Sequence, residues 1–299
     1  MKPTSVIFII VAVVLIIAGT ITCSVAQSNA EKEGVDIFSY NYNESGDLLD
    51  TVDFRAENVN RIKISLGRCD VHIIGGGDRA EAELVNFERY KYSLSMTDGE
   101  LKITDGIGFG SFVTVSSGGI SFDGMRYLFP FGGKGRIRID ENAKRSVTVY
   151  LPDTLGIRKI DIEVQEGDVM FENIAYNADC SVVSSLGNIS VIGNAQVQTG
   201  YSLTAESGDI IFDHPAFAGV ADMHSSSGNI GITVARDNEC EYRVDAPLGS
   251  VMYYGTSAGH AYHSGTTYPC KITAASDKGN IAVDSPASDQ TQDSDTQAS

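Results

Sequence analysis

One short phrase recurs six times in the C-terminal half of the sequence, and it constrains the fold more than any other feature. The phrase is a glycine, a small polar residue, an apolar residue, a spacer and a second apolar residue. The glycines are Gly167, Gly187, Gly208, Gly228, Gly249 and Gly279, and successive ones lie 20, 21, 20, 21 and 30 residues apart. A fixed period in this range is typical of repeat architectures.

Inward and outward positions alternate on both sides of each glycine. In the first repeat Ile160, Ile162 and Val164 lie seven, five and three residues before the glycine. The residues two and four positions after the glycine are apolar in all six repeats. Such alternation predicts two short strands, each with one buried face. The position three before the glycine is Ser or Ala in five of six repeats, because only a small side chain fits where the chain bends sharply inside a coil.

These strands could form isolated hairpins, but a single repeat cannot bury its own apolar face. Stacking the repeats about 4.8 Å apart does bury it. Glycine followed by Asp or Asn also suits the tight turn between the two strands. We therefore predict an all-β chain in which residues 156–284 form a β-solenoid, similar to a single-stranded β-helix, with about six coils of about 20 residues.

The residue after each glycine falls in one column of the predicted solenoid. The column consists of Asp168, Asn188, Asp209, Asn229, Ser250 and Asn280. A row of cation ligands is conceivable there, but Asn and Ser lower its charge, and a ladder of hydrogen bonds between coils explains the column better. We expect a structural turn ladder built from this column and the six glycines, and no metal site.

The five cysteines differ in where the template places them. Cys23 lies in an apolar N-terminal segment, whereas Cys69 and Cys180 occupy inward columns, where a buried thiol behaves as a small apolar residue. Cys240 and Cys270 each lie nine residues before the glycine of their repeat, and these two repeats are consecutive. Stacking would bring their Cα atoms about 5 Å apart, within disulfide range. We predict this bridge, with two unpaired thiols as the alternative.

Residues 5–26 contain no charged side chain and are long enough to span a bilayer as a helix. Lys2 precedes the segment and glutamates dominate after it, so the positive-inside tendency places residues 1–4 in the cytoplasm. A cleaved signal peptide ending at residues 24–26 and a lipoprotein signal at Cys23, where the lipobox is poor, are the alternatives. The expected location is the cell membrane, as a single-pass protein whose bulk is extracytoplasmic.

Residues 27–50 are polar and suggest a linker, and an N-terminal β region follows over residues 51–155. In this region residues 81–104 predict two strands around Asp98 and Gly99. A further strand over residues 146–151 ends at a proline and leads into the regular coils.

The β region also contains a match to the repeat template. Ile62 and Ile64 lie five and three residues before Gly67, and Cys69 and Val71 lie two and four residues after it. This spacing predicts an early, atypical coil.

Two further segments depart from the repeat. Residues 106–136 are rich in glycine and aromatic residues. They could form a flexible loop that contacts a partner or the membrane surface, although an inserted hairpin packed on the solenoid is the favoured interpretation. Residues 285–299 are polar and acidic, without large apolar side chains, and are expected to be disordered.

The charge and the motifs of the chain exclude several functions. A net charge of −17 argues against binding to nucleic acid or to anionic headgroups. The sequence contains no phosphate loop and no zinc-protease or serine-hydrolase motif. His260 and His263 fall in an insertion, where a polar loop is a simpler explanation than a metal site. Asp161 and Glu163 share an outward face, but the equivalent positions in the next two repeats hold no acidic residue. We therefore predict no enzyme and no cofactor.

The N-terminal membrane segment, the strand over residues 147–152 and the repeated Gly-Asp/Asn-Ile turns together resemble a known bacterial family. The family comprises the "putative adhesin" domains of unknown function, including membrane-anchored proteins of Lia-type cell-envelope-stress operons. The resemblance covers roughly residues 50–284. It implies a β-solenoid outside the cytoplasm and supplies no catalytic residues to carry over.

The resulting hypothesis is a non-enzymatic, membrane-anchored binding or scaffold module in adhesion or envelope stress. Its expected partners are the membrane, through the N-terminal helix, and cell-wall or surface glycans or another envelope protein. A polysaccharide-acting β-helix enzyme and a secreted surface protein that self-assembles through its terminal coils are the alternatives.

Overall fold

The computed structural model describes ten stretches of the chain. They are residues 41–42, 48–53, 59–87, 92–105, 114–116, 119–121, 143–193, 199–235, 240–264 and 270–286. These residues form strands and turns and contain no helix, which confirms the all-β prediction for this part of the chain. None of them belongs to a helix long and apolar enough to cross a bilayer. The predicted membrane segment 5–26 and residues 287–299 lie outside the described residues.

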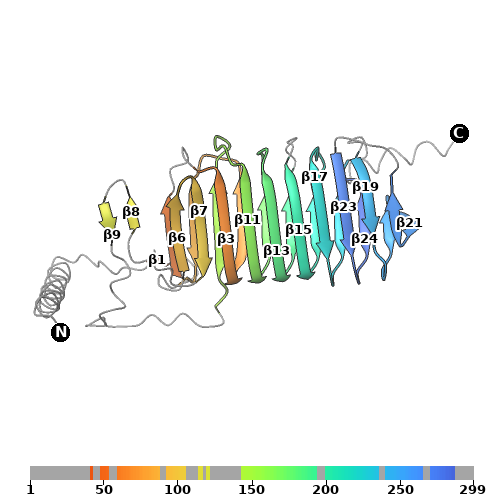
Figure 1. Cartoon of the computed structure of the whole chain (residues 1–299), viewed down its shortest axis with the longest axis horizontal. Coiled ribbons are helices and arrows are strands. Elements are labelled where there is room, and N and C mark those ends of the chain that lie inside the picture. Colours follow the sequence, from red (N-terminus) through yellow and green to blue (C-terminus); the bar gives the residue numbers. More distant parts are fainter. Residues whose placement is uncertain are drawn as a thin grey trace, which may run out of the picture.

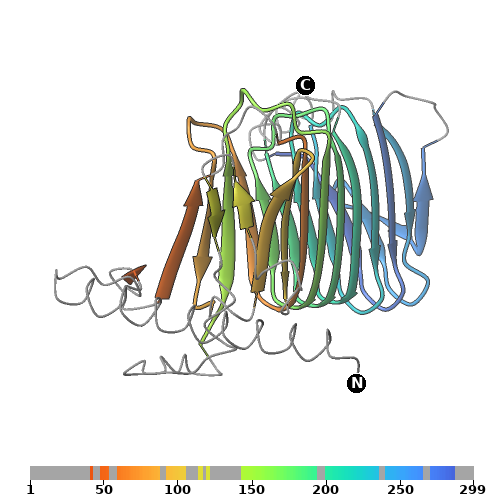
Figure 2. The same cartoon turned by 60° about the vertical axis from the view of Figure 1, so that its left-hand side comes forward.

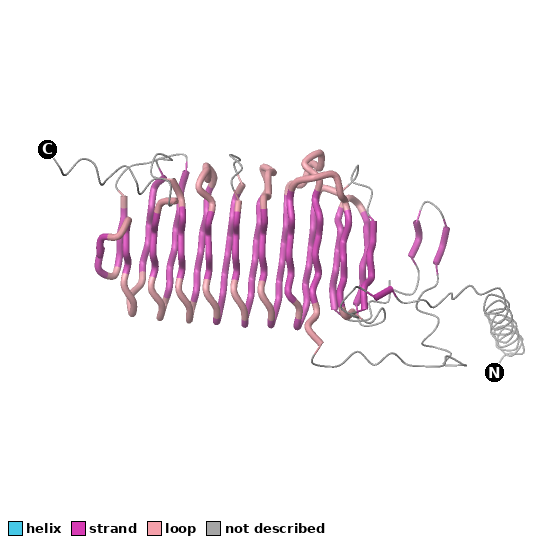
Figure 3. The backbone as a smooth tube through the Cα atoms, turned by 180° about the vertical axis from the view of Figure 1, so that it is seen from behind, coloured by secondary structure: helices cyan, strands magenta, loops and turns pink. Residues whose placement is uncertain are grey.

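Stacked coils form two sheets that face each other across one core (Figures 1 and 2). In each coil a strand of the ten-stranded sheet B leads through a tight turn into a strand of the twelve-stranded sheet A. The coils are β3 (Arg61–Arg68) with β4 (Asp70–Gly75), β11 (Lys159–Glu166) with β12 (Val169–Glu172), β13 (Asp179–Leu186) with β14 (Ile189–Ile192), β15 (Gly200–Ser207) with β16 (Ile210–Asp213), β17 (Val220–Ser225) with β18 (Ile230–Thr233), β19 (Cys240–Asp245) with β20 (Val251–Tyr253), and β23 (Cys270–Ser276) with β24 (Ile281–Asp284). The tight turns line one long edge of the molecule (Figure 3).

Inward side chains of successive coils lie directly on one another. The column five residues before the glycine is Ile162, Val182, Leu203, Met223, Ala274 and Val244, all paired in parallel register and all buried. Phe171, Phe212 and Phe217 are the largest fully buried side chains, and the last two rings meet edge to face with centroids 4.9 Å apart. These stacked side chains form one continuous core. Each large apolar side chain contributes roughly 1.5–3 kcal/mol when buried.

The early coil is present, but its predicted register is wrong by two residues. Ile62 pairs with Ile160, so it lies seven positions before the turn rather than five. Cys69, not Gly67, therefore occupies the glycine position, and Asp70 precedes Asp168 in the turn column. A two-residue shift keeps every side chain on the same face of the strand, so the apolar pattern alone could not detect the error.

The last two coils are stacked in the reverse of their sequence order. β23 pairs with both β17 and β19, and β24 pairs with both β18 and β20. The C-terminal coil, residues 270–284, therefore lies between the coil ending at Thr233 and the coil that starts at Cys240 (Figure 1). The coils that contain Cys240 and Cys270 are neighbours, as predicted. Their order along the stack, however, is the reverse of their order in the sequence.

Antiparallel strands flank the coils at both ends of the solenoid. At one end sheet A continues through β10 (Ser146–Leu151), β5 (Glu81–Val85), β2 (Leu48–Asp53) and β1 (Asn41–Tyr42), and sheet B continues through β7 (Glu100–Asp105) and β6 (Tyr92–Thr97). Here β10 and β7 stack in parallel, and β5, β2, β1 and β6 pair antiparallel. At the other end β21 (Thr256–Gly259) pairs with β20, and β22 (Ala261–His263) pairs with β19. These strands cover the terminal coils.

Two segment predictions differ from the structure. Residues 81–104 hold three strands rather than two, because β5 precedes the β6–β7 hairpin. β1 and the start of β2 fall within the predicted linker 27–50. Within the insertion 106–136, β8 (Thr114–Ser116) and β9 (Gly119–Ser121) pair as a separate two-stranded hairpin, and the rest of the insertion lies outside the described residues.

Candidate functional site

The polar residues at the tight turns join every coil to the next. The Oδ1 atom of Asp168 accepts a hydrogen bond from the backbone N–H of Asn188 at 2.8 Å, and Asn188 Oδ1 accepts one from Asp209 at 2.9 Å. The same contact runs from Asp70 to Ser250 in the order Asp70, Asp168, Asn188, Asp209, Asn229, Asn280 and Ser250. Only an acceptor oxygen is needed, so Asp and Asn serve equally.

Ser250 is the last member of this ladder because its coil is the last of the stack. It stacks on Asn280, donates its hydroxyl to Asn280 Oδ1 at 2.9 Å, and belongs to the last coil of the stack. Among the described residues no further coil follows it, so the ladder gives its side chain no backbone N–H to accept from. A shorter side chain is sufficient there.

The glycines allow adjacent turns to approach each other closely. A Cβ atom placed on Gly187, Gly208 or Gly228 would lie 2.0 Å from the carbonyl oxygen of the glycine in the neighbouring coil. Gly167 and Gly187 also have φ angles of +142° and +149°, which side chains rarely adopt. Close approach therefore accounts for the glycine column, and the glycines do not form a phosphate loop.

Serines inside the coils complete the polar contacts of the turns. Ser225 donates to the carbonyl of Gly208 at 2.9 Å, and Ser276 donates to that of Gly228 at 2.7 Å. Both serines are fully buried, yet each has a partner. A small side chain at this position thus fits the bend and also satisfies a turn carbonyl.

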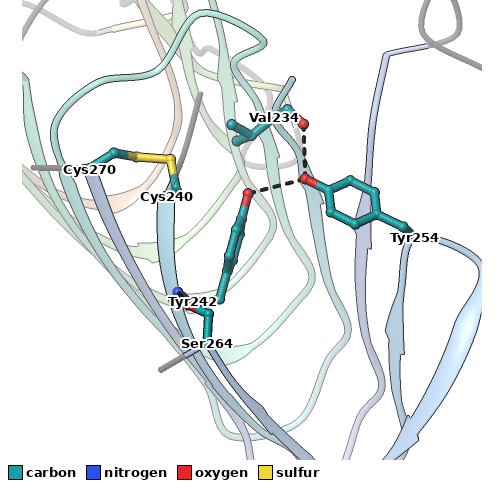
Figure 4. Close-up of a disulfide and its surroundings, with 6 residues drawn as sticks. All are labelled: Val234, Cys240, Tyr242, Tyr254, Ser264 and Cys270. Atoms are coloured by element: carbon teal, nitrogen blue, oxygen red, sulfur yellow. Dashed lines mark hydrogen bonds between the residues drawn. A yellow bond between two sulfur atoms is a disulfide. The ribbon is translucent and has the colours of Figure 1, made fainter. Parts of the chain in front are cut away.

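Cys240 and Cys270 form a disulfide with Cα atoms 4.6 Å apart (Figure 4). They are direct register partners on β19 and β23. The bond therefore joins the C-terminal coil to the coil that stacks on it. Beside it the hydroxyls of Tyr242 and Tyr254 lie 3.4 Å apart, and Tyr254 also reaches the carbonyl of Val234.

The two thiols described outside this bridge lie in the core. Burial raises the pKa of both Cys69 and Cys180, so each stays protonated and unreactive at physiological pH. His260 contacts the carbonyl of Gly249 and His263 faces Glu241, so the two histidines have separate partners. Among the described residues no group of three metal-ligating side chains occurs.

One buried histidine has a side chain without a hydrogen-bond partner among the described residues. His214 is 1% exposed, and neither ring nitrogen has a partner there. Its ring stacks on Phe212 and meets Phe217 edge to face. Burial lowers the pKa of His214, which keeps the ring neutral. The side chain acts as part of the aromatic core, and the sequence pattern did not single it out.

The outer surface of sheet A is the most regular surface of the solenoid. Over β12, β14, β16, β18, β24 and β20 its side chains lie in three parallel rows, which we call the sheet A face. The ladder row is the turn column from Asp168 to Ser250. The middle row is Met170, Ser190, Ile211, Gly231, Ala282 and Met252, and the outer row is Glu172, Ile192, Asp213, Thr233 and Asp284.

The charged residues of this face lie only in its two flanking rows. Its middle row carries no charged residue, whereas the two flanking rows hold the carboxylates Asp168, Asp209, Glu172, Asp213 and Asp284. No Lys or Arg occurs in the three rows. On sheet B, by contrast, Lys159, Lys271 and Arg243 are interspersed among acidic residues. The alternation of residues predicted which side chains point outward, but not this difference between the two sheets.

A protein-family model described as Toastrack DUF4097 matches residues 59–298 of the chain. A comparison with curated proteins finds no match. Among solved structures, a putative cell adhesion protein from Clostridium sporogenes is 11% identical, with a TM-score of 0.46, over 80% of this chain and 100% of its own. A putative adhesin from Bacteroides fragilis is 15% identical, with a TM-score of 0.38, over 80% of this chain and 97% of its own.

Proposed function

The chain belongs to the Toastrack DUF4097 family, whose function is unknown, so we propose its function from the site itself. The repeated turns of the sequence had already indicated this resemblance. The protein acts as a non-enzymatic binding or scaffold module outside the cytoplasm, held at the membrane by residues 5–26. The observation that carries this proposal is the sheet A face. It presents three rows of side chains in register over six strands, about 24 Å long at the usual strand spacing.

The arrangement of carboxylates supports binding over catalysis. The ladder row and the outer row lie four residues apart along each strand, which is about 13 Å. The uncharged middle row separates them, and no Lys or Arg stands among them. A polysaccharide-acting enzyme would instead place two carboxylates about 5–9.5 Å apart on either side of one glycosidic bond.

The disulfide supports an extracytoplasmic location. Disulfides persist in oxidising compartments and are rare in the cytosol, and Cys240–Cys270 closes two neighbouring coils. A protease added to intact cells should therefore cleave the protein while a cytoplasmic marker stays intact. Full protection in intact cells, with cleavage only after lysis, would contradict this location.

The covered ends argue against self-assembly through the terminal coils. β6 at one end and β21 and β22 at the other pair antiparallel with the last strands of the stack. β22 is only three residues long and carries an exposed His263. Short, polar edge strands are a usual device against edge-to-edge pairing.

Binding is tested by pull-down. The full chain and the fragment 27–299 are offered purified cell wall, surface glycans and solubilised envelope proteins. We expect saturable retention on at least one of these, competed by free protein. A blank result on all of them would refute the binding function.

A further inference from the structure

We propose that the sheet A face binds a cationic amphipathic helix that lies along the solenoid axis. The partner's apolar side would rest on the middle row, and its Lys or Arg side chains would reach the carboxylates on either side. This inference names the partner class for the proposed binding function and rests on it.

The charge distribution favours a cationic partner. The five carboxylates of the ladder row and the outer row face outward, without a Lys or Arg in either row. Among them, Glu172 contacts His72 of the neighbouring coil at 3.1 Å. The chain as a whole carries a net charge of −17. Complementary fields of this kind raise the association rate of positively charged partners and disfavour anionic ones.

The middle row supplies an apolar contact. In this row Ile211 is 48% exposed and Met252 is 38% exposed. Ile192 of the outer row, on the strand beside that of Ile211, adds a further apolar side chain that is 41% exposed. Between Ile211 and Met252 the row holds only Gly231 and Ala282. A Cβ atom on Gly231 would meet no other atom within 4 Å. A large apolar side chain of a partner therefore has room above the sheet at this point.

The dimensions of the face fit a helix. The two carboxylate rows are about 13 Å apart, and an α-helix with its side chains is about 10–12 Å wide. Six strands span about 24 Å. At 1.5 Å per residue this is the length of about 16 helical residues.

The backbone of the sheet also favours a helix over an extended peptide. The strands of the face are paired on both sides, apart from the shorter pairing of β20 with β21 at one end. Their N–H and C=O groups are therefore used within the sheet. A partner resting on the face gains only side-chain contacts, so it must satisfy its own backbone hydrogen bonds, as a helix does.

The test uses the purified full chain and a fluorescent 16-residue peptide of Leu, Ala and Lys. The peptide carries Leu along one helical side and Lys along both flanks of that side. We expect saturable binding by fluorescence anisotropy, weakened by added salt because the contact is partly electrostatic. A peptide with Glu in place of Lys should not bind, and equal binding of the two peptides would overturn the proposal.

Matched variants separate the face from the rest of the solenoid. Ile211→Lys places a cation in the middle row and should weaken binding roughly tenfold or more. Val183→Lys makes the same change on the outer surface of sheet B, where Val183 is 40% exposed, and should leave binding unchanged. Circular dichroism checks that both variants fold. Equal affinities for the two variants would overturn the proposal.

Charge removal gives a second, independent variant pair. The triple change D168N/D209N/D213N keeps the ladder acceptors, since Asn188 already serves in that role, and should weaken binding. The sheet B triple D179N/D222N/D245N removes the same charge elsewhere and should not. Should the peptide fail to bind while cell wall or glycans are still retained, the helix proposal is overturned and the binding function stands.

Discussion

The close approach of the turns makes a sharp prediction for Gly208→Ala. The new Cβ atom would lie 2.0 Å from the carbonyl oxygen of Gly187 and 2.6 Å from its carbonyl carbon. Ordinary contacts of a Cβ atom begin near 3.4 Å. Both clashing atoms belong to the backbone, so no side chain can rotate away. The two coils must separate at this turn by more than about 1 Å.

That separation acts on hydrogen bonds between the same two coils. Gly187 N–H donates to Ser207 O at 3.1 Å, Ile189 N–H to Asp209 O at 3.0 Å, and Asp209 N–H to Asn188 Oδ1 at 2.9 Å. Lengthening each by more than about 1 Å takes it beyond hydrogen-bonding range. At about 0.5–1.5 kcal/mol per bond, we expect a loss of about 2–4 kcal/mol in the free energy of unfolding.

Urea denaturation followed by circular dichroism measures this loss. Gly231→Ala is the matched control, because it makes the same change in the next coil but its Cβ meets no atom within 4 Å. The control should be neutral or stabilising by up to about 1 kcal/mol, since glycine is unfavourable inside a strand. Equal stabilities for the two variants would refute the close-approach explanation of the glycine column.

Three further predictions concern the ladder, the disulfide and the buried histidine. Asp209→Asn should leave the free energy of unfolding within about 0.5 kcal/mol of the parent. Asp209→Leu should lower it by about 1–2 kcal/mol, because it removes the acceptor for Asn229 N–H. Equal denaturation curves for these two variants would contradict the ladder. Cys270→Ser should lower stability by about 2–4 kcal/mol under oxidising conditions, and reductant should remove the difference; a difference that persists in reductant would show another cause. The lowered pKa of His214 means that the unfolded chain binds a proton first, so stability should fall as pH drops below 6.5 and this contribution should vanish above it. His214→Phe should flatten that part of the pH profile and raise stability by about 1–2 kcal/mol, and an unchanged profile would refute the assignment.

The sequence predicted the coils well because the turn demands a particular residue. Only glycine tolerates the neighbouring carbonyl, so Gly187 and Gly208 mark their coils unambiguously, and the inward columns follow by counting. In the first coil, formed by β3 and β4, glycine is not required at this position, and Cys69 takes its place. The repeat template therefore matched Gly67, two residues before Cys69, as the turn residue, which explains the two-residue error.

Coil order is a different kind of information. The coils that begin at Cys240 and Cys270 share the same inward columns, so either would pack on β17 and β18 equally well by pattern alone. The chain passes over one position before it reaches Cys240, and the long connection between the two coils lets it return to that position. Likewise, strand alternation predicted that Ile211 points outward, but not that the sheet A face lacks basic residues. Those properties depend on the stacking of whole strands.

The intercalated C-terminal coil also bears on how the protein is made. Residues 240–264 emerge from the ribosome before residues 270–284, yet the later segment lies beneath them in the stack. The end of the rod therefore cannot reach its final arrangement until the last coil has been synthesised. A chain that terminates some thirty residues early would lose its last coil and leave the coil from Cys240, with β21 and β22, without a parallel neighbour. An intact end of the rod thus reports that translation reached the C-terminal coil.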